Sequence, residues 1–228
     1  MKKNKSKMKF NVLTIFPQLI DHYCSESILG RAQEDDLIDI NSINIREFTD
    51  DKHNTVDAKP YGGGAGMVMK PEPIYKALKS IDGLVDKENK NKKTILMSPR
   101  GKEYDQEMAR SFSDLDELTI ICGRYEGVDQ RVVDYMIDQE VSIGPYVLAG
   151  GELPALTVVE STSRLISGVL GNPESLEEES YQRKADKSIE TEYPQYTRPQ
   201  KFKDWEVPDV LLSGNHKKID KWRKKNSK

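Results

Sequence analysis

GRYEGVD at residues 123–129 and SIGPYVLAGGELP at residues 142–154 are the two stretches that decide the fold. Each follows a short apolar run that is typical of a buried strand, and each precedes a helical pattern. In open α/β sheets, ligands bind where the carboxyl ends of the strands lead into loops. Glycine lets the main chain approach a ligand closely because it has no Cβ. We therefore predict one pocket built mostly from main chain, with Arg124, Tyr125 and Glu126 as its side-chain contacts.

Strands and helices alternate through most of the chain. Apolar runs and flanking turn residues predict strands at 9–16, 37–45, 94–97, 118–122 and 140–143. Helical patterns lie at 18–34, 71–81, 103–113, 129–138 and 152–167, while residues 46–70 read as a loop. This order predicts an α/β fold with a mostly parallel sheet and helices on both faces. The composition shifts at Gly168, after which a polar, charged linker precedes two short helical patterns at 207–212 and 214–225.

Composition excludes several classes of protein. The 228 residues suit one medium domain with a small appendage, and a net charge of −3 gives no overall field that would attract nucleic acid. The apolar run after the basic N-terminus is short and lacks a small-residue cleavage site, which argues against a signal peptide. No stretch approaches the ~18–20 apolar residues that span a bilayer. Cys24 and Cys122 lack metal-ligand spacing, and we expect a reduced, cytoplasmic protein without a membrane partner.

Three patterns carry little functional signal by themselves. The glycine run at 62–66 lacks the lysine of a phosphate-binding loop and does not follow a strand, so a flexible turn is the default. His22, His53 and His216 lie far apart in the sequence, which makes a zinc site improbable, and we predict no metal ligands. No serine has the setting of a nucleophile elbow, so acyl transfer is unsupported.

Three further features have an ordinary structural interpretation, and the last of them also has a functional one. Arg164 follows Glu160 by four residues, the spacing of an ordinary surface ion pair on a helix. The glutamates at 177–179 form a run that is ordinarily solvated. YPQYTRP at 193–199 holds two tyrosines and an arginine between prolines; it forms either a packed proline turn or a stiff surface on which unpaired bases stack.

Taken together, the motifs resemble a known family. They are LTIFP (13–17), PYGGGAGM (60–67), SPRG (98–101), CGRYEGVD (122–129), SIGPYVLAGGELPA (142–155), GVLGN (168–172), YPQYTRP (193–199) and VPDVLLSGNH (207–216). In this order, over almost the whole chain, they resemble the bacterial tRNA (guanine-N1)-methyltransferases of the SPOUT superfamily. The resemblance implies methyl transfer from S-adenosylmethionine to N1 of guanine 37 in tRNA.

The resemblance also implies an architecture. A knotted cofactor-binding domain would cover residues 1–170, with a C-terminal trefoil knot in its mostly parallel sheet. Residues 171–190 would be an interdomain linker, and residues 191–228 a small helical tRNA-binding domain that is shorter than in relatives. The family works as a homodimer, with each active site at the subunit interface, and the resemblance suggests a need for Mg²⁺.

Site residues follow from the matched motifs. The cofactor loops correspond to Met97, Ser98, Pro99, Gly123, Tyr125, Glu126, Ile143, Gly144, Pro145, Tyr146, Val147, Leu148, Gly150 and Gly151. The residues that would contact tRNA are Tyr196, Arg198 and His216.

Guanine N1 carries a proton at neutral pH, so a base must remove it, and negative charge then develops towards O6. The resemblance places the base at Glu179 and the stabilising cation at Arg164. Glu179 replaces the aspartate of the family and adds one methylene, and Pro145 stands where relatives often have aspartate. Two alternatives therefore remain open. One is a protein that binds cofactor and RNA without catalysis, and the other is a SPOUT methyltransferase with a different RNA target.

Overall fold

The computed structural model describes residues 7–85, 88–171, 182–183 and 189–227. The chain divides into two compact units, Met1–Gly171 and Asn172–Lys228, and each is described by itself. The predicted base Glu179 and most of the predicted linker 171–190 lie outside the described residues.

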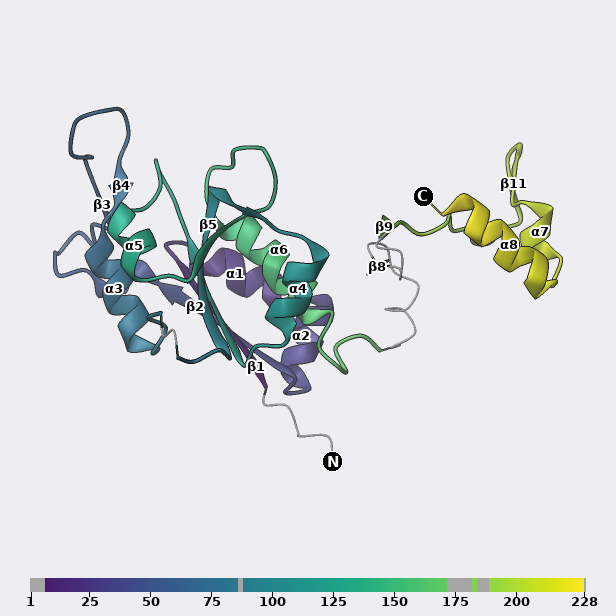
Figure 1. The fold of residues 1–228 in the computed structure, drawn as a ribbon, viewed down its shortest axis with the longest axis horizontal. Helices are drawn as coiled ribbons and strands as arrows, with labels where there is room; N and C mark the ends of the chain where they lie inside the picture. Colours follow the sequence, from purple (N-terminus) through teal and green to yellow (C-terminus); the bar gives the residue numbers. More distant parts are fainter. Residues whose placement is uncertain (1–6, 86–87, 172–181, 184–188, 228) are drawn as a thin grey trace. The chain divides into compact units, whose positions relative to one another are not determined.

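A five-stranded sheet forms the centre of the first unit (Figure 1). Its strands lie in the order β2-β1-β6-β5-β7, and every neighbouring pair is parallel. Their bounds are β1 (Met8–Thr14), β2 (Ile38–Asn44), β5 (Lys92–Glu103), β6 (Glu117–Cys122) and β7 (Gln139–Ser142). Because all five strands run the same way, their carboxyl ends share one edge of the sheet, where ligands bind in folds of this kind.

Helices cover both faces of this sheet, as the alternating pattern predicted. One face carries α1 (Pro17–Cys24), α2 (Ser27–Glu34), α4 (Gln106–Ser113) and α6 (Glu152–Ser163). The other carries α3 (Pro71–Ser80), α5 (Gln130–Tyr135) and the 3₁₀ helix η1 (Ile45–Phe48). A parallel sheet buried on both sides needs apolar residues on both faces of its strands, which explains the near-continuous apolar runs in the sequence.

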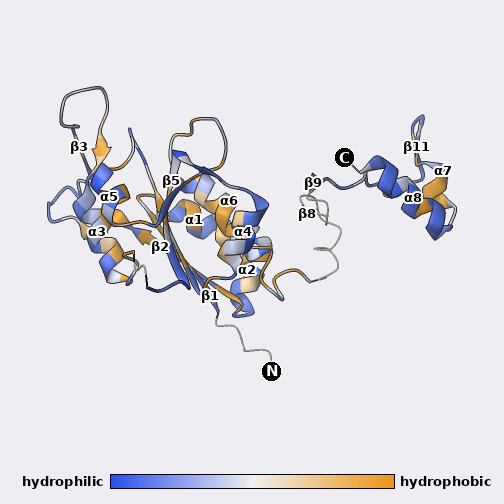
Figure 2. Ribbon diagram, in the orientation of Figure 1, coloured by the Kyte–Doolittle hydropathy of each residue, from blue (hydrophilic) through white to orange (hydrophobic). Residues whose placement is uncertain are grey.

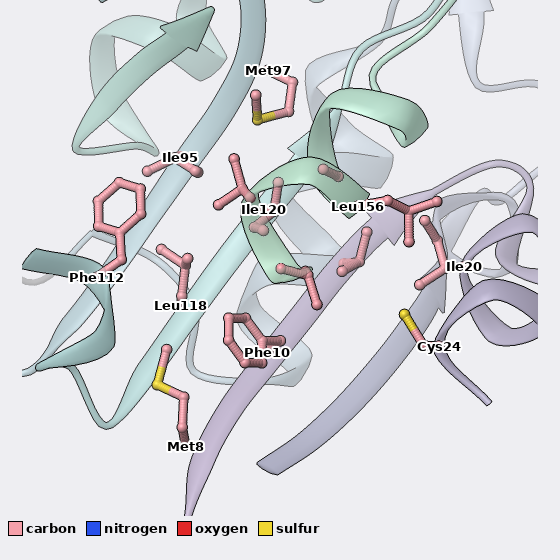
Figure 3. Close-up of a cluster of buried hydrophobic side chains, with 14 of the residues drawn as sticks. Met8, Phe10, Ile20, Cys24, Ile95, Met97, Phe112, Leu118, Ile120 and Leu156 are labelled. Atoms are coloured by element: carbon pink, nitrogen blue, oxygen red, sulfur yellow. The ribbon is translucent and has the colours of Figure 1, made fainter. Parts of the chain in front are cut away.

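Successive side chains of each central strand point into opposite cores. In β1, Phe10 and Val12 pack among the helices of the first face, whereas Leu13 packs among those of the second. Figure 3 shows Phe10, Leu118 and Ile120 in the first core, with Phe112 of α4 to one side of them and Leu156 of α6 to the other. Helix α6 carries apolar residues around most of its circumference, as its orange colour in Figure 2 shows, because it is buried among neighbours.

The single helix predicted at 18–34 is wrong, because the structure has two helices with a break between them. At the end of α1 the Ser25 amide donates to the Asp21 carbonyl oxygen and the Glu26 amide to that of Tyr23, and Ser27 has a φ of 53°. A Cβ on Gly30 would lie 2.3 Å from the Ser25 carbonyl oxygen. The chain therefore turns tightly here, and glycine lets α2 pass close to the end of α1.

Two further boundaries differ from the sequence prediction. Strand β5 extends to Glu103 instead of ending at Met97, because Lys102 and Glu103 pair with β7 again after an irregular step. The predicted loop 46–70 contains η1 and a small antiparallel pair, β3 (Asp57–Ala58) and β4 (Val68–Met69). Both features lie beside the edge where the strands end.

The described residues of the second unit form two helices and two small antiparallel pairs. Its elements are β8 (Gln182–Arg183), β9 (Ile189–Glu190), β10 (Lys201–Phe202), β11 (Trp205–Glu206), α7 (Asp209–Leu212) and α8 (His216–Asn226). Asn215 caps α8 by accepting a hydrogen bond from the Lys218 amide. Among the residues that the structure describes, none of the helices is both long and apolar enough to cross a membrane.

Candidate functional site

A cavity of about 480 Å³ opens at the carboxyl-terminal edge of β5, β6 and β7. This size lies within the range of pockets that hold small organic ligands. Thirteen of the fourteen residues predicted for cofactor binding line it, which leaves out Pro145, an exposed residue of the third loop. The tertiary structure thus brings three loops around one space. Residues 123–127 are called the first loop, residues 97–99 the second and residues 143–151 the third.

Sequence reasoning did not place several lining residues in this cavity. They include Val68, Arg100, Val128, Gln130, Glu140 and Pro154. Arg100 and Glu140 come from β5 and β7, and their charged groups lie 3.6 Å apart, while Arg100 also donates to Gln130 at 3.2 Å. Arg100 and Glu140 could have been identified from the sequence by their positions beside predicted strands, because the carboxyl ends of parallel strands meet at one edge of the sheet.

The first loop turns sharply and is held by a neighbouring segment. Tyr125 has a φ of 61°, and the Gly127 amide donates to the Arg124 carbonyl oxygen at 3.1 Å. The Glu126 amide donates to the Met67 carbonyl oxygen at 3.0 Å. A Cβ on Gly66 would lie 2.4 Å from a carboxylate oxygen of Glu126. The glycine-rich segment that the sequence marked as a flexible turn therefore packs against the first loop of the cavity.

Main-chain contacts also join the first and third loops. The Gly151 amide donates to the Gly123 carbonyl oxygen at 2.9 Å, and Arg124 forms an antiparallel bridge with Gly150. A Cβ on Gly151 would lie 2.7 Å from the Cys122 Cα, so this position needs glycine. At Gly123 the nearest atom would be the Met97 carbonyl oxygen at 3.5 Å, an ordinary contact, so a methyl group fits there.

A buried carboxylate lies behind these loops. Glu152, only 2% exposed, is the first residue of α6. Its Oε2 accepts from Arg124 Nε at 2.9 Å and lies 2.8 Å from Arg124 Nη2, while its Oε1 accepts from the Thr14 hydroxyl at 2.7 Å. The Arg124 guanidinium also lies over the Phe16 ring, 4.6 Å from its centroid, and donates to the Ala149 carbonyl oxygen at 3.3 Å.

Arg164 does not line the cavity. It caps the C-terminus of α6, whose N-terminus lies at the cavity, so about 18 Å of helix separates the two at 1.5 Å per residue. Its amide donates to the Glu160 carbonyl oxygen at 3.1 Å. The Glu160 carboxylate accepts a hydrogen bond from the Tyr23 hydroxyl, which raises the pKa of Tyr23.

The residues predicted to contact tRNA belong to the second unit. Tyr196 and Arg198 are exposed in the segment before β10, and His216 is exposed at the start of α8. The Tyr196 ring meets Trp222 of α8 edge to face at 6.2 Å, and Arg223 lies over the Tyr193 ring at 4.6 Å. Within the described ranges, no group of three or more His, Cys, Asp or Glu side chains is arranged to hold a metal ion.

A parallel α/β sheet with a cavity of this size among the loops at its carboxyl edge is typical of proteins that bind a small organic ligand. The comparisons with known proteins are more specific. The chain belongs to the tRNA (guanine-1)-methyltransferase TrmD family, whose model matches residues 8–228.

Curated relatives are named tRNA (guanine-N(1)-)-methyltransferase. The chain is 51% identical to that of Carboxydothermus hydrogenoformans, with 96% of this chain and 83% of the relative aligned. It is 49% identical to that of Clostridioides difficile, with 96% and 92% aligned, and 50% identical to that of Clostridium perfringens strain 13, with 96% and 88% aligned.

Proposed function

We propose that this protein transfers a methyl group from S-adenosylmethionine to N1 of guanine 37 in tRNA, in the cytoplasm. The observation that carries the proposal is the cavity, which gathers the loops matching the family's cofactor motifs on one edge of the sheet.

The cavity fits this cofactor chemically. Residues of the third loop at 143–151 line it, and main-chain N–H and C=O groups of such a loop suit an adenine and a ribose. Glu126 is among the lining residues, and a carboxylate near the ligand favours a positively charged sulfonium or ammonium group. When bound, the cofactor supplies an electrophilic methyl group.

The protein would then supply a base for the guanine N1 proton and a cation for the charge that develops on O6. We assign these roles to Glu179 and Arg164. A carboxylate acts as general base when it lies within hydrogen-bond reach of the proton that it removes. An arginine donates two aligned N–H groups, a geometry suited to a carbonyl oxygen that becomes negative.

A homodimer would explain the position of Arg164. About 18 Å of α6 separates Arg164 from the cavity of its own chain, far beyond the length of its side chain. A second subunit could bring its Arg164 to this cavity. Helices α1 and α6 pack together and leave Leu19, Tyr23 and Leu153 between 47% and 65% exposed, with Phe16 beside them at 41%. Exposed apolar patches of this kind are typical of protein interfaces.

We also propose the knotted topology and the tRNA-binding role of the second unit. The knot is supported by the third loop, which returns across the end of β6 so closely that Gly151 lies against Cys122. The tRNA contact is supported by exposed Tyr196, Arg198 and His216 beside α8, whose sequence HKKIDKWRKKN is rich in lysine. Aromatic and basic residues together suit unpaired bases and phosphates.

The experiment is methyl transfer from labelled cofactor to a tRNA transcript with guanine 37, against a transcript with adenine 37, with and without Mg²⁺. Glu179→Gln should lower the single-turnover rate by ~10²–10⁴-fold, the usual range for an acid–base group. Glu177→Gln and Glu178→Gln are the matched controls and should change it little. Cofactor binding without methylation would favour the non-catalytic alternative, and methylation at another position would favour a different target.

Subunit mixing tests the dimer. A heterodimer of one Arg164→Ala subunit and one Glu179→Gln subunit keeps one intact site if the two residues meet from different chains. Activity no higher than that of either homodimer would contradict the arrangement.

A further inference from the structure

We infer that Glu152 is a positioning residue for the cofactor pocket: by holding Arg124, it fixes the first loop of the cavity against the third. The inference rests on the proposed cofactor site and adds a residue that contacts no cofactor atom in that proposal.

The Arg124 side chain joins three segments of the chain. Its Nε donates to Glu152 Oε2 at the start of α6, its Nη2 lies 2.8 Å from the same oxygen, and its Nη1 donates to the Ala149 carbonyl oxygen of the third loop. It also lies over Phe16 in the turn after β1. Its own main chain belongs to the first loop, so this one side chain connects the first loop, the third loop and the β1–α1 turn.

Gly150 shows how closely the third loop follows Arg124. A Cβ on Gly150 would lie 2.1 Å from Arg124 Nε and 2.5 Å from Arg124 Cδ and Cζ. The glycine therefore makes room for the guanidinium. The sequence marked Gly150 as a position where main chain meets ligand, whereas the structure shows that it is filled from behind by protein.

Glu152 fixes the orientation of the arginine. Its carboxylate is almost completely buried, and a buried charge is tolerated when it is paired and its other acceptors are occupied. Here both oxygens are occupied, Oε2 by Arg124 and Oε1 by Thr14. Thr14 Oγ1 in turn accepts from the Phe16 amide at 2.9 Å, which holds the ring on which the guanidinium rests. Glu152 thus supports Arg124 directly and supports its aromatic neighbour through Thr14.

If Glu152 only stabilised the fold, its substitution would affect stability without a specific effect on cofactor affinity. A glutamate at the opposite edge of the sheet, Glu117, supplies the matched control. Glu117 begins β6, accepts from Asn11 of β1 at 2.9 Å and lies 3.4 Å from Lys92 Nζ. Like Glu152 it is a mostly buried glutamate with a β1 side chain on one oxygen and a cation on the other. It lines no part of the 480 Å³ cavity.

The test measures S-adenosylmethionine affinity by calorimetry and melting temperature for Glu152→Gln, Arg124→Lys and Glu117→Gln. Glutamine keeps the shape of Glu152 but loses its charge, and lysine keeps the charge of Arg124 but loses the fork of N–H groups. We expect Glu152→Gln and Arg124→Lys to weaken cofactor binding by about tenfold or more, equivalent to about 1.4 kcal/mol. Glu117→Gln should lower the melting temperature and leave cofactor affinity within about twofold of wild type, an expected difference of about 0.4 kcal/mol.

The KM for tRNA gives a second readout. It should stay unchanged in Arg124→Lys and Glu152→Gln while the KM for cofactor rises. If wild type binds no cofactor, the proposed function fails. If wild type binds and Arg124→Lys, the milder change, binds equally well, the positioning role is wrong whether or not Glu152→Gln folds. Equal loss of affinity in Glu117→Gln would also overturn it, because the effect would then follow stability alone.

Discussion

The two edges of the central sheet contain the same polar arrangement and use it differently. At the amino-terminal edge, Glu117 lies between Asn11 and Lys92. At the carboxyl-terminal edge, Glu152 lies between Thr14 and Arg124. A cavity of about 40 Å³ adjoins the first, against about 480 Å³ beside the second. A buried glutamate paired with a cation is therefore not sufficient to form a cavity that could hold a ligand.

The surroundings of each carboxylate account for the difference. Lys92 shares its charge with the exposed Asp82, at 3.4 Å. Arg124 instead extends along glycine main chain and over an aromatic ring, so its loop is held on several sides. Loops fixed in this way can present main-chain groups to a ligand without reordering, and this lowers the entropy lost on binding.

The largest expected effect is a loss of cofactor affinity when the backbone of the third loop is displaced at the carboxyl-terminal edge. Gly151→Ala places a methyl group 2.7 Å from Cys122 Cα and 2.9 Å from the Gly123 amide nitrogen, so the third loop must move. We expect cofactor affinity to fall by about 100-fold or more, since a misplacement of about 1 Å has effects of this order. Gly171→Ala is the control, because an added Cβ there meets no atom within 4 Å and the residue does not line the cavity, and it should bind within about threefold of wild type. Calorimetry decides, and normal binding by Gly151→Ala would show that the third loop does not form the site.

Removing the β1 side chain at each edge separates stability from binding. Thr14→Val and Asn11→Leu keep side-chain volume but each leaves a buried carboxylate oxygen without its donor. We expect each to lower the free energy of unfolding by about 1–3 kcal/mol. Thr14→Val should also weaken cofactor binding several-fold, because it loosens Glu152 and Phe16, whereas Asn11→Leu should not. Urea unfolding and calorimetry measure the two effects, and equal cofactor affinities in both variants would remove the distinction between the edges.

Folding stability at alkaline pH should depend on two buried thiols, that of Cys122 at the carboxyl-terminal edge and that of Cys24 away from it. Burial raises the pKa of Cys122 well above its usual value, and the Glu152 carboxylate raises it further. Burial, with Asp21 and Glu160, raises the pKa of Cys24 from 9.0 to about 12. The unfolded chain releases these protons near pH 9 and the folded chain does not, so stability is complete below pH 9 and falls as pH rises towards 12.

The slope gives the test. Each thiol contributes up to about 1.4 kcal/mol of lost stability per pH unit above 9. Urea unfolding between pH 8 and 11 should show a shallower decline in a Cys24→Ala/Cys122→Ala variant than in wild type. Parallel curves would mean that the two thiols ionise in the folded protein as readily as in the unfolded chain.

The smallest expected effect is on the free energy of unfolding, when an exposed ion pair at the amino-terminal edge is removed. Asp82→Asn removes the exposed partner of Lys92 and leaves Glu117 in place. Asparagine also tolerates the φ of 53° at this position. Because exposed ion pairs contribute little, we expect the free energy of unfolding to change by less than about 0.5 kcal/mol. A larger change in thermal or urea unfolding would mean that this edge depends on its surface charges as well as on the buried glutamate.

Local patterns were sufficient where neighbouring residues decide the structure. The strand at 118–122 was predicted to within a residue because a parallel strand buried on both faces is a short apolar run, and β6 is buried throughout. The two glycine loops were placed at strand ends for the same reason, and thirteen of fourteen predicted residues meet in one cavity. The prediction for 18–34 failed because the close contact of Gly30 with Ser25, which the helical pattern does not reveal, requires a break.

The sequence by itself determined the α/β order of elements and the loops that end the strands, since periodicity and glycine act over a few residues. Only the tertiary structure decided that Glu152 would meet Thr14, 138 residues away, and Arg124, 28 residues away. In the sequence Glu152 is an ordinary acid in the first turn of a helix, a position that the helix dipole favours. Its burial, and the charge that must then be paired, exist only once the sheet has brought the ends of β1 and β6 side by side.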